Sequence, residues 1–454
     1  MPTVTSINPY TQKEIESFTT HTKKEVKVFL DKAEKRFASW KTTSFTERKE
    51  LLNNAAKELK ENKETYAKKI TEEIGKPISQ SIAEIEKCAW VCEYYAANAA
   101  SHLEDEIIET DAETSYVSYE PLGVLLAVMP WNYPFWQVFR FAAPALMAGN
   151  VAVLKHASNV FGSALNIQKV FEKAGFPKNC FTTLLIKSDI VASIIENPII
   201  KAVTITGSGP AGSAVASKAG ENIKKTVLEL GGNNALIALK DCDIDATLDT
   251  VVQARFQNTG QSCIAGKRLL VHKDIENEFT QKLVKKVREL KSGNPSNAET
   301  YIGTMARTDL AVELEEILQK SIKMGANVLL GGNRQNAYFE PTIVNNVTTK
   351  MSLFKEETFG PVLPILPFKD IEEAIELSNN SNFGLGVSIF TKDIKSIQPY
   401  ISQFEEGAVF INTLVKSDPR LPFGGVKQSG YGRELSSHGI QEFVNRKTVY
   451  ITTS

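Results

Sequence analysis

Short apolar segments alternate with helical stretches along most of this chain, and this alternation restricts the possible folds more than any other feature. The first five apolar runs occupy residues 124–128, 151–154, 181–186, 202–206 and 226–230. Strands that alternate with helices are typical of βαβ units, in which the strands pair in a parallel sheet. The sequence therefore predicts an α/β protein.

A second series of strand candidates indicates a second α/β unit. Its members lie at residues 235–239, 327–330, 387–390 and 408–412. Ahead of both series, residues 23–101 carry apolar side chains at three- and four-residue spacing, which predicts helices. The acidic segment 103–121 separates these helices from the first strand series and is predicted to be a strand pair.

Composition excludes several classes of protein. The length of 454 residues allows about three domains or two large ones. The 52 basic and 53 acidic residues cancel almost completely, so no basic excess favours nucleic acid or a membrane surface as a partner. The longest apolar run, residues 122–130, is far shorter than the ~20 residues of a membrane span.

The cysteine content and the N-terminus favour a reducing compartment. The chain contains five cysteines, too few at this length for a disulfide framework. The N-terminal residues lack the basic and apolar regions of a secretory signal. A cytoplasmic protein is therefore expected. No Cys or His pair has the spacing of a zinc site, so no metal is expected.

A glycine-rich loop at residues 207–212 has the spacing G-x-G-x-x-G between a strand candidate and a helical segment. Such glycines let the backbone approach a pyrophosphate, and the helix N-terminus favours its charge. A turn without a ligand is the alternative.

A dinucleotide site would require an acidic residue about 20 residues further on, where Glu229 lies. Glu229 precedes a second tight turn at a strand's carboxyl end, so it is equally a candidate catalytic carboxylate.

Cys263 is the candidate nucleophile, with a purely structural cysteine as the alternative. It lies among small and polar residues at a turn, which suits an accessible thiol. The other four cysteines lie on an aromatic-rich helix, at the start of an apolar strand and in an acidic turn. None of the five histidines lies in a Cys-His protease signature, so Glu229 is the best candidate for a base.

These residues are part of a larger pattern, and with it the chain resembles the aldehyde dehydrogenase superfamily from end to end. The matching pieces, in the family's order, are residues 130–134, Lys155, 207–212, 229–232, 260–263, 356–361 and 422–425. Within the family, residues 154–159 and 417–425 resemble the short bacterial succinate-semialdehyde dehydrogenases. The resemblance implies two Rossmann-like open α/β domains and a small β arm that joins subunits into a homodimer or homotetramer.

The resemblance also implies domain boundaries. The cofactor-binding domain would comprise residues 1–102 and 122–231, the catalytic domain residues 232–426, and the oligomerisation arm residues 103–121 and 444–453. The acidic strand pair at residues 103–121 would thereby serve to join subunits.

The implied reaction is the oxidation of succinate semialdehyde to succinate with NAD(P)+. Cys263 would attack the aldehyde carbon as a thiolate, forming a hemithioacetal. Asn132 and the backbone N–H of Cys263 would stabilise its oxyanion. After hydride transfer, Glu229 would activate the water that hydrolyses the thioester. Asn132 would also suit the turn in which it lies, and Glu229 a helix cap or a surface ion pair.

The cofactor contacts are carried over from the same resemblance. They are Trp131, Lys155, Gly207, Ser208, Glu357 and Phe359. NAD-preferring relatives commonly have a glutamate three residues after the lysine, where this chain has Ser158. A serine beside Lys155 can accept a 2′-phosphate that a carboxylate would repel. NADP is therefore favoured, with NAD as the alternative. Gly209 and Pro210 replace the more usual threonine and acidic pair of the loop.

The substrate prediction depends on Arg140, the one charged residue between positions 122 and 154. An unpaired buried charge is costly, and a substrate carboxylate would satisfy it bidentately. An internal ion pair to a glutamate is the alternative. The resemblance implies Ser417 as a second contact, while Gln257 replaces an arginine of longer family members.

Other functions stay open at this point. Gln257 leaves room for a broader aldehyde dehydrogenase that takes medium-chain or aromatic aldehydes. An acylating enzyme that uses coenzyme A is disfavoured by Glu229, because a water-activating carboxylate favours hydrolysis. A non-catalytic member of the family is disfavoured because Cys263, Glu229 and Asn132 are all present.

Overall fold

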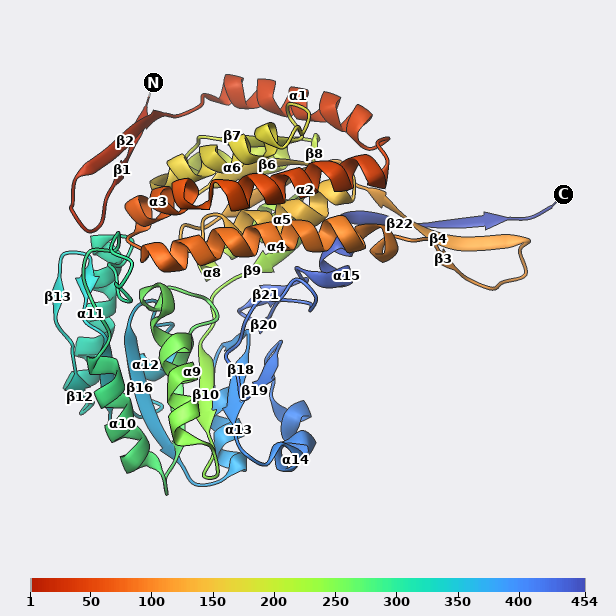
Figure 1. Ribbon diagram of the computed structural model, residues 1–454. Helices are drawn as coiled ribbons and strands as arrows, with labels where there is room; N and C mark the ends of the chain where they lie inside the picture. The colour runs from red at the N-terminus through yellow and green to blue at the C-terminus, as the bar shows by residue number, and fades with distance from the viewer. Residues whose placement is uncertain (1, 454) are drawn as a thin grey trace.

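The computed structural model describes residues 2–453. Two large sheets, each flanked by helices, form two units that lie one above the other in Figure 1. The α/β class predicted from the sequence is thus confirmed. No helix in the described residues combines the length and the apolar character that crossing a membrane requires.

The upper sheet has six strands in the order β21-β9-β8-β5-β6-β7. Their bounds are β5 (Val124–Met129), β6 (Val151–His156), β7 (Phe181–Leu184), β8 (Ile200–Thr206), β9 (Lys225–Glu229) and β21 (Gly430–Tyr431). The strands β5 to β9 pair in parallel, as the apolar runs predicted. The chain proceeds from β5 to β6 and β7 on one side and returns to β8 and β9 on the other. A crevice at this reversal is where open α/β sheets bind ligands.

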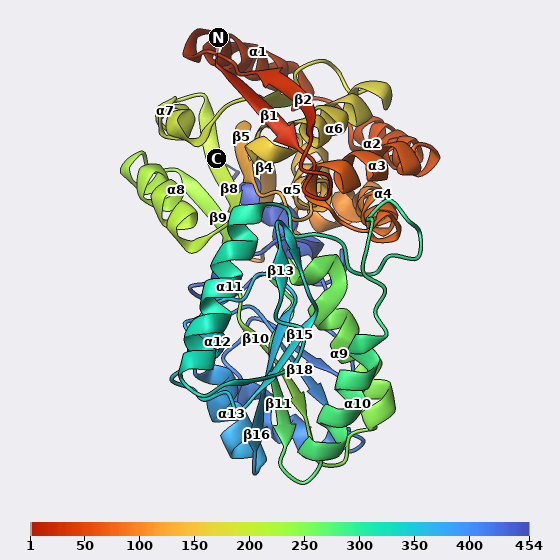
Figure 2. The same cartoon turned by 90° about the vertical axis from the view of Figure 1, so that its left-hand side faces the viewer.

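Helices pack around the upper sheet (Figure 2). They are α1 (Lys23–Trp40), α2 (Phe45–Glu61), α3 (Lys63–Ile74), α4 (Ile78–His102), α5 (Trp136–Met147), α6 (Phe161–Lys173), α7 (Val191–Glu196) and α8 (Gly209–Glu221). The first four account for the helical periodicity of residues 23–101. Capping boxes begin α1, at Thr22 and Glu25, and α2, at Ser44 and Glu47, which explains why the helices start there.

The lower sheet has seven strands in the order β12-β15-β16-β11-β10-β18-β19, and only β12 is antiparallel to its neighbour. The strands are β10 (Asn234–Ala238), β11 (Gly266–His272), β12 (Asn327–Leu330), β15 (Thr342–Asn345), β16 (Val362–Phe368), β18 (Val387–Phe390) and β19 (Val409–Ile411). The flanking helices are α9 (Ile244–Phe256), α10 (Glu276–Arg288), α11 (Thr308–Lys323) and α13 (Ile371–Asn379). The sequence did not predict β11, β15 or β16.

Shorter elements complete the two units. They are β13 (Arg334–Gln335), β14 (Tyr338–Phe339), β17 (Phe383–Gly384), β20 (Val426–Lys427), α12 (Ser352–Lys355), α14 (Ile394–Ile397) and α15 (Ser436–Ile440). A hairpin of β1 (Thr3–Ile7) and β2 (Glu14–Thr19), which the sequence did not predict, precedes α1.

A third, three-stranded sheet extends away from both units (Figure 1). In it β22 (Val444–Ile451) pairs antiparallel with β4 (Thr114–Pro121) over the full length of both strands, and β3 (Glu106–Ile107) pairs with β4. Residues 103–121 therefore form a strand pair, as expected, and the C-terminal strand joins it.

The chain passes from the upper to the lower sheet within residues 230–233, between β9 and β10. The carboxyl ends of β5, β8 and β9 and the amino ends of β10 and β11 consequently meet at the boundary between the two units. The predicted site residues are concentrated there.

Candidate active site

Cys263 lies at the point where two cavities meet, because its side chain lines both of them. One cavity, of about 180 Å³, is bordered by α4 and α5 and is called here the helix-side cavity. The other, of about 240 Å³, is bordered by the glycine loop after β8 and is called the loop-side cavity. A nucleophile at such a junction can contact a ligand in each cavity at once.

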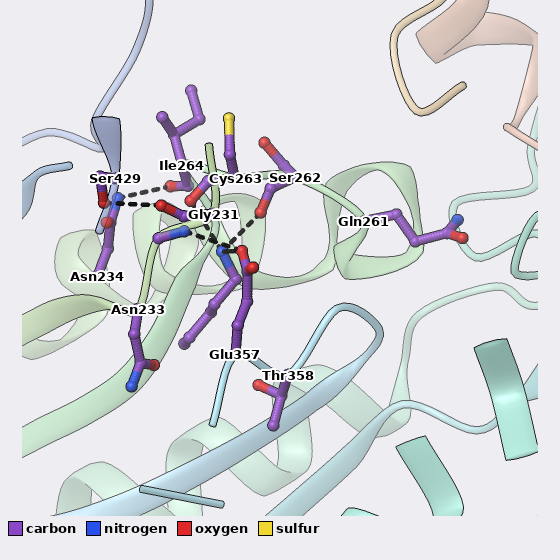
Figure 3. A network of polar contacts seen from close by, with 12 residues as sticks. Gly231, Asn233, Asn234, Gln261, Ser262, Cys263, Ile264, Glu357, Thr358 and Ser429 are labelled. Carbon is purple, nitrogen blue, oxygen red and sulfur yellow. Dashed lines mark hydrogen bonds and ion pairs between the residues drawn. The ribbon is translucent and has the colours of Figure 1, made fainter. Parts of the chain in front are cut away.

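The loop that carries Cys263 is held from its carbonyl side. Lys267, at the start of β11, donates hydrogen bonds of 2.8 Å to the carbonyl oxygens of both Ser262 and Cys263. The ammonium also pairs with Glu357 at 2.9 Å, and Glu357 accepts a 3.0 Å hydrogen bond from the N–H of Gly232. In Figure 3 the sulfur of Cys263 points away from this network. The network therefore fixes the backbone and leaves the thiol free.

A strained turn precedes the nucleophile loop. Asn258 and Thr259, in the 3-10 helix η3 (Gln257–Gly260), have φ values of 54° and 53°. The amide of Asn258 donates to the carbonyl oxygens of Asn132, at 2.8 Å, and Gln261, at 3.1 Å. Left-handed conformations of such residues persist where surrounding structure enforces them, frequently at active sites. Here the hydrogen bonds of the strained residue Asn258 connect the Cys263 loop to the loop after β5.

Asn132 lies in that second loop, 4% exposed, and lines the loop-side cavity. Its amide nitrogen donates to the carbonyl oxygen of Gln261 at 3.2 Å. The backbone N–H of Cys263 has no hydrogen-bond acceptor within residues 2–453. The predicted pair of oxyanion donors is thereby located on two loops that are hydrogen-bonded to each other.

The thiol of Cys263 rests in its protonated form. Burial raises its pKa above the ordinary value, although the positive charges of Arg140 and Lys267 act in the opposite direction. The thiolate is the nucleophilic form of cysteine. The thiol must therefore lose a proton before it can attack.

Glu229 ends β9, only 2% exposed, and neither of its carboxylate oxygens has a hydrogen-bond partner among the described residues. Burial and the nearby Glu434 raise its pKa well above the ordinary value. The side chain lines neither cavity. In this structure Glu229 is therefore a buried carboxyl group whose ionisation is disfavoured and which lines neither cavity.

Arg140 has an internal partner, which is the alternative that the sequence left open. This α5 residue is 1% exposed and forms an ion pair with Glu434, in the segment after β21. It also donates a 3.3 Å hydrogen bond to Thr206 and lies 4.7 Å from the ring centroid of Phe423. Arg140 still lines the helix-side cavity, as do Ser417 and Gln257. Its charge, however, is already compensated within the protein.

Five of the predicted cofactor residues meet in the loop-side cavity. They are Trp131, Gly207, Ser208, Glu357 and Phe359. The rings of Trp131 and Phe359 make an edge-to-face contact with centroids 5.7 Å apart. This cavity opens at the strand-order reversal between β5 and β8, at the N-terminus of α8, where a pyrophosphate is favoured.

Lys155 and Ser158 do not line that cavity. Lys155 lies at the end of β6, next to β5 in the sheet, and Ser158 begins the following 3-10 helix η1 (Ser158–Val160). The Lys155 ammonium has no ion-pair partner within the described residues, and burial lowers its pKa. Strand β5 lies between β6, which carries Lys155, and β8, which precedes the glycine loop. A half-buried cation without a partner at this position fits the far end of a dinucleotide.

Several charged residues near the site, four of them buried and one half-buried, were missed by sequence reasoning. They are Lys76, Glu84, Lys87, Lys267 and Glu434. Glu84 pairs with Lys76 and accepts hydrogen bonds from the N–H groups of Phe135 and Trp136, at the start of α5. One signal was available: Glu84 and Lys87 lie three residues apart, at positions where the α4 pattern expects buried side chains.

The model of the "Aldehyde dehydrogenase family" matches residues 2–449. A probable succinate-semialdehyde dehydrogenase [NADP(+)] from Synechocystis is 47% identical over 451 residues, covering 99% of both chains. Succinate-semialdehyde dehydrogenase [NADP(+)] 1 from Mycobacterium tuberculosis is 44% identical over 454 residues, again covering 99% of both.

Solved structures agree with these relatives. The crystal structure of succinic semialdehyde dehydrogenase from Streptococcus pyogenes, in complex with NADP+, superposes with a TM-score of 0.97 at 34% identity. The match covers 99% of this chain and 100% of that one. Sequence, fold and the arrangement around Cys263 thus lead to one conclusion: the chain belongs to the aldehyde dehydrogenase family.

Proposed function

We propose that this protein oxidises succinate semialdehyde to succinate with NADP+ as the hydride acceptor. The observation that carries the proposal is the position of Cys263 at the junction of the two cavities. The loop-side cavity has a glycine loop and a helix N-terminus suited to a dinucleotide. The helix-side cavity has cationic and hydroxyl groups suited to a short acid. The relatives named above bear the same activity in their names.

The residues divide the chemistry among them. The Cys263 sulfur forms a bond to the aldehyde carbon, and the carbonyl oxygen becomes an oxyanion. Asn132 and the Cys263 N–H stabilise this charge, and each such donor contributes about 2.7–4 kcal/mol at the transition state. The residues of the loop-side cavity, among them Ser208 and Glu357, would hold NADP+, which would supply the hydride acceptor. Glu229 then takes a proton from the water that attacks the thioester carbon, and the carbon–sulfur bond breaks.

The buried carboxyl group of Glu229 must change state for this role. In the structure its pKa is raised and it lines neither cavity. Rotation of the side chain toward the thioester would break no hydrogen bond, because neither carboxylate oxygen has a partner among the described residues. Deprotonation and rotation of Glu229 are therefore part of the proposed hydrolysis step.

The choice of NADP rests on residues after β6. Lys155 and Ser158 together offer a positive charge and a hydroxyl donor, and no carboxylate occupies position 158. A 2′-phosphate is stabilised by such a pair. Lys155 would hold the adenosine ribose and Ser158 the phosphate, whereas Glu357 would orient the nicotinamide ribose.

The proposed domain boundaries follow the sheets. Residues 1–102 and 122–231 would bind the cofactor, and residues 232–426 would form the catalytic domain. Residues 103–121 and 444–453 would join subunits of a homodimer or homotetramer. The exposed Ile107, Tyr450 and Ile451 on that arm supply apolar surface for such a contact. Five cysteines without a disulfide suit a cytoplasmic location.

The test is the absorbance of reduced cofactor with purified protein, succinate semialdehyde and either NADP+ or NAD+. We expect turnover with NADP+ and none in the Cys263→Ala variant. Turnover with NAD+ alone would refute the NADP assignment and leave the chemistry intact. Activity on neutral aldehydes, with none on succinate semialdehyde, would favour the broader aldehyde dehydrogenase, to which the uncharged Gln257 in the helix-side cavity is suited.

A further inference from the structure

We propose that Lys87, and not Arg140, is the principal cation that binds the carboxylate of the substrate. The inference rests on the proposed function and identifies how the helix-side cavity selects an acid semialdehyde. It begins with the ion pair between Arg140 and Glu434, which leaves the charge of Arg140 compensated before any ligand arrives.

Lys87 lies on α4 and lines the same cavity as Cys263. Its side chain is half-buried. The ammonium donates a 2.9 Å hydrogen bond to the hydroxyl of Ser417 and lies 4.2 Å from the ring centroid of Trp136. No carboxylate lies within ion-pair distance of it in residues 2–453. Lys87 is thus a cation in the cavity wall with no anionic partner among the described residues.

Two other buried lysines near the site have carboxylate partners within the protein. Lys76 pairs with Glu84, and Lys267 pairs with Glu357. A cation withdrawn from water is costly unless an anion or several acceptors replace the solvent. The single hydroxyl contact of Lys87 does not supply that compensation, whereas a ligand carboxylate would.

Ser417 strengthens the site. Its oxygen accepts the hydrogen bond from Lys87, so its own hydroxyl proton is free to donate. Two donors of different kinds therefore line one part of the cavity, and a carboxylate has two oxygens to accept from them. The rings of Trp136 and Phe423 line the same cavity and suit the two methylene groups between the carboxylate and the aldehyde.

The charge of Lys87 is adjusted by its surroundings. Burial and the nearby Arg140 lower its pKa to about 8, while Cys88, Glu84 and Asp418 act in the opposite direction. Both carboxylates are engaged elsewhere, Glu84 with Lys76 and Asp418 with Arg420. Lys87 is therefore mostly protonated at neutral pH.

A second lysine in this cavity provides a matched control. Lys416 also lines it, next to Ser417, but its side chain is exposed. Charges in contact with water contribute little to binding, because solvent screens them. The proposal therefore predicts different results for the two lysines.

The experiment measures kcat and KM for succinate semialdehyde and for butanal, which has four carbons and no carboxylate. In Lys87→Met, KM for succinate semialdehyde should rise about 10- to 100-fold, the effect of losing one charge-assisted contact. Values for butanal should change less than about twofold. Lys87→Arg should recover part of the loss, and Lys416→Met should resemble the wild type. An equal loss on both aldehydes, or a larger loss in Lys416→Met, would overturn the proposal.

A binding measurement separates this inference from the proposed function. Butanoate should protect Cys263 from alkylation by iodoacetamide in the wild type and not in Lys87→Met, whether or not turnover occurs. Equal protection of both proteins would overturn the role of Lys87. A wild type that has the same kcat/KM for butanal as for succinate semialdehyde, yet shows Lys87-dependent protection, would refute the proposed substrate. It would retain Lys87 as the carboxylate-binding group. Thermal unfolding verifies that each variant is folded.

Discussion

Arg140 and Glu434 form a buried ion pair that lies against the carboxyl group of Glu229. Glu434 is one of the two causes that raise the pKa of Glu229, after burial, while Arg140 lowers it. Three ionisable side chains from α5, β9 and the segment after β21 are thereby electrostatically coupled. The protonation of the proposed base therefore depends on an ion pair whose arginine also lines the helix-side cavity.

The first prediction concerns Glu434→Gln. Removing the negative charge should lower the pKa of Glu229, because a like charge no longer opposes its ionisation and Arg140 loses its partner. The part of the kcat–pH profile in which kcat increases with pH should move to lower pH, by on the order of one unit. Glu315→Gln is the control, since Glu315 pairs with Arg334 and lines neither cavity. Superimposable profiles of Glu434→Gln and wild type would contradict the coupling.

Glu229→Gln should stabilise the folded protein at neutral and alkaline pH while it slows thioester hydrolysis. Since burial raises the pKa of Glu229 in the folded state, the neutral form favours folding at acid pH. As pH rises above the unfolded-state pKa of ~4.5, the wild type loses stability by up to about 1.4 kcal/mol per pH unit, until the folded-state pKa is reached. Glutamine has no such loss. Urea unfolding at pH 5 and pH 8 should therefore show a variant advantage that grows with pH; a constant difference would refute it.

Asn132→Ala tests the oxyanion donor. We expect kcat/KM to fall about 100- to 1,000-fold, with the KM of the cofactor unchanged, because the donor acts on charge that develops during the reaction. Asn132 also donates to Gln261 in the nucleophile loop, so a displaced loop would be a competing cause. The rate at which iodoacetamide alkylates Cys263 distinguishes the two. A large change in that rate would assign the loss to loop position.

Ser158→Glu should change the cofactor preference. A carboxylate at the start of η1 would repel a 2′-phosphate and accept a hydrogen bond from a 2′-hydroxyl. The KM for NADP+ should rise at least about tenfold and that for NAD+ should not rise. Ser188→Glu is a matched control, because Ser188 begins the 3-10 helix η2 (Ser188–Ile190) after the neighbouring strand β7. Equal effects of both substitutions on NADP+ would argue against a phosphate contact at Ser158.

The upper strands β5 to β9 and their parallel pairing could be predicted because their apolar runs are uninterrupted. Strand β11 was missed for a physical reason: it opens with Lys267 and Arg268, which read as surface residues but are 0% and 1% exposed. Their charges are compensated by carbonyl groups and by Glu357, which come from other parts of the chain. Local patterns contain no record of such partners.

The site divides in the same way. Cys263 and Gly207 could be proposed as site residues because glycines and turns mark their loops, whereas Asn132 was proposed from the family resemblance. The ion pair of Arg140 with Glu434 and the contact of Lys87 with Ser417 each join segments far apart in the sequence. Such pairings depend on how α4, α5 and the C-terminal segment pack, which periodicity alone does not determine.

The pairing of the last strands with the first unit has a consequence for biosynthesis. Strand β21 completes the edge of the upper sheet beside β9, and β22 pairs with β4, although the whole lower unit is translated between them. The ribosome must therefore release nearly the entire chain before the upper sheet acquires its final edge. Glu434, which follows β21, arrives with it, so a nascent chain contains Cys263 long before it contains the charge that adjusts Glu229. The edge of the upper sheet and the charges around Glu229 are consequently complete only once the C-terminal segment has been synthesised.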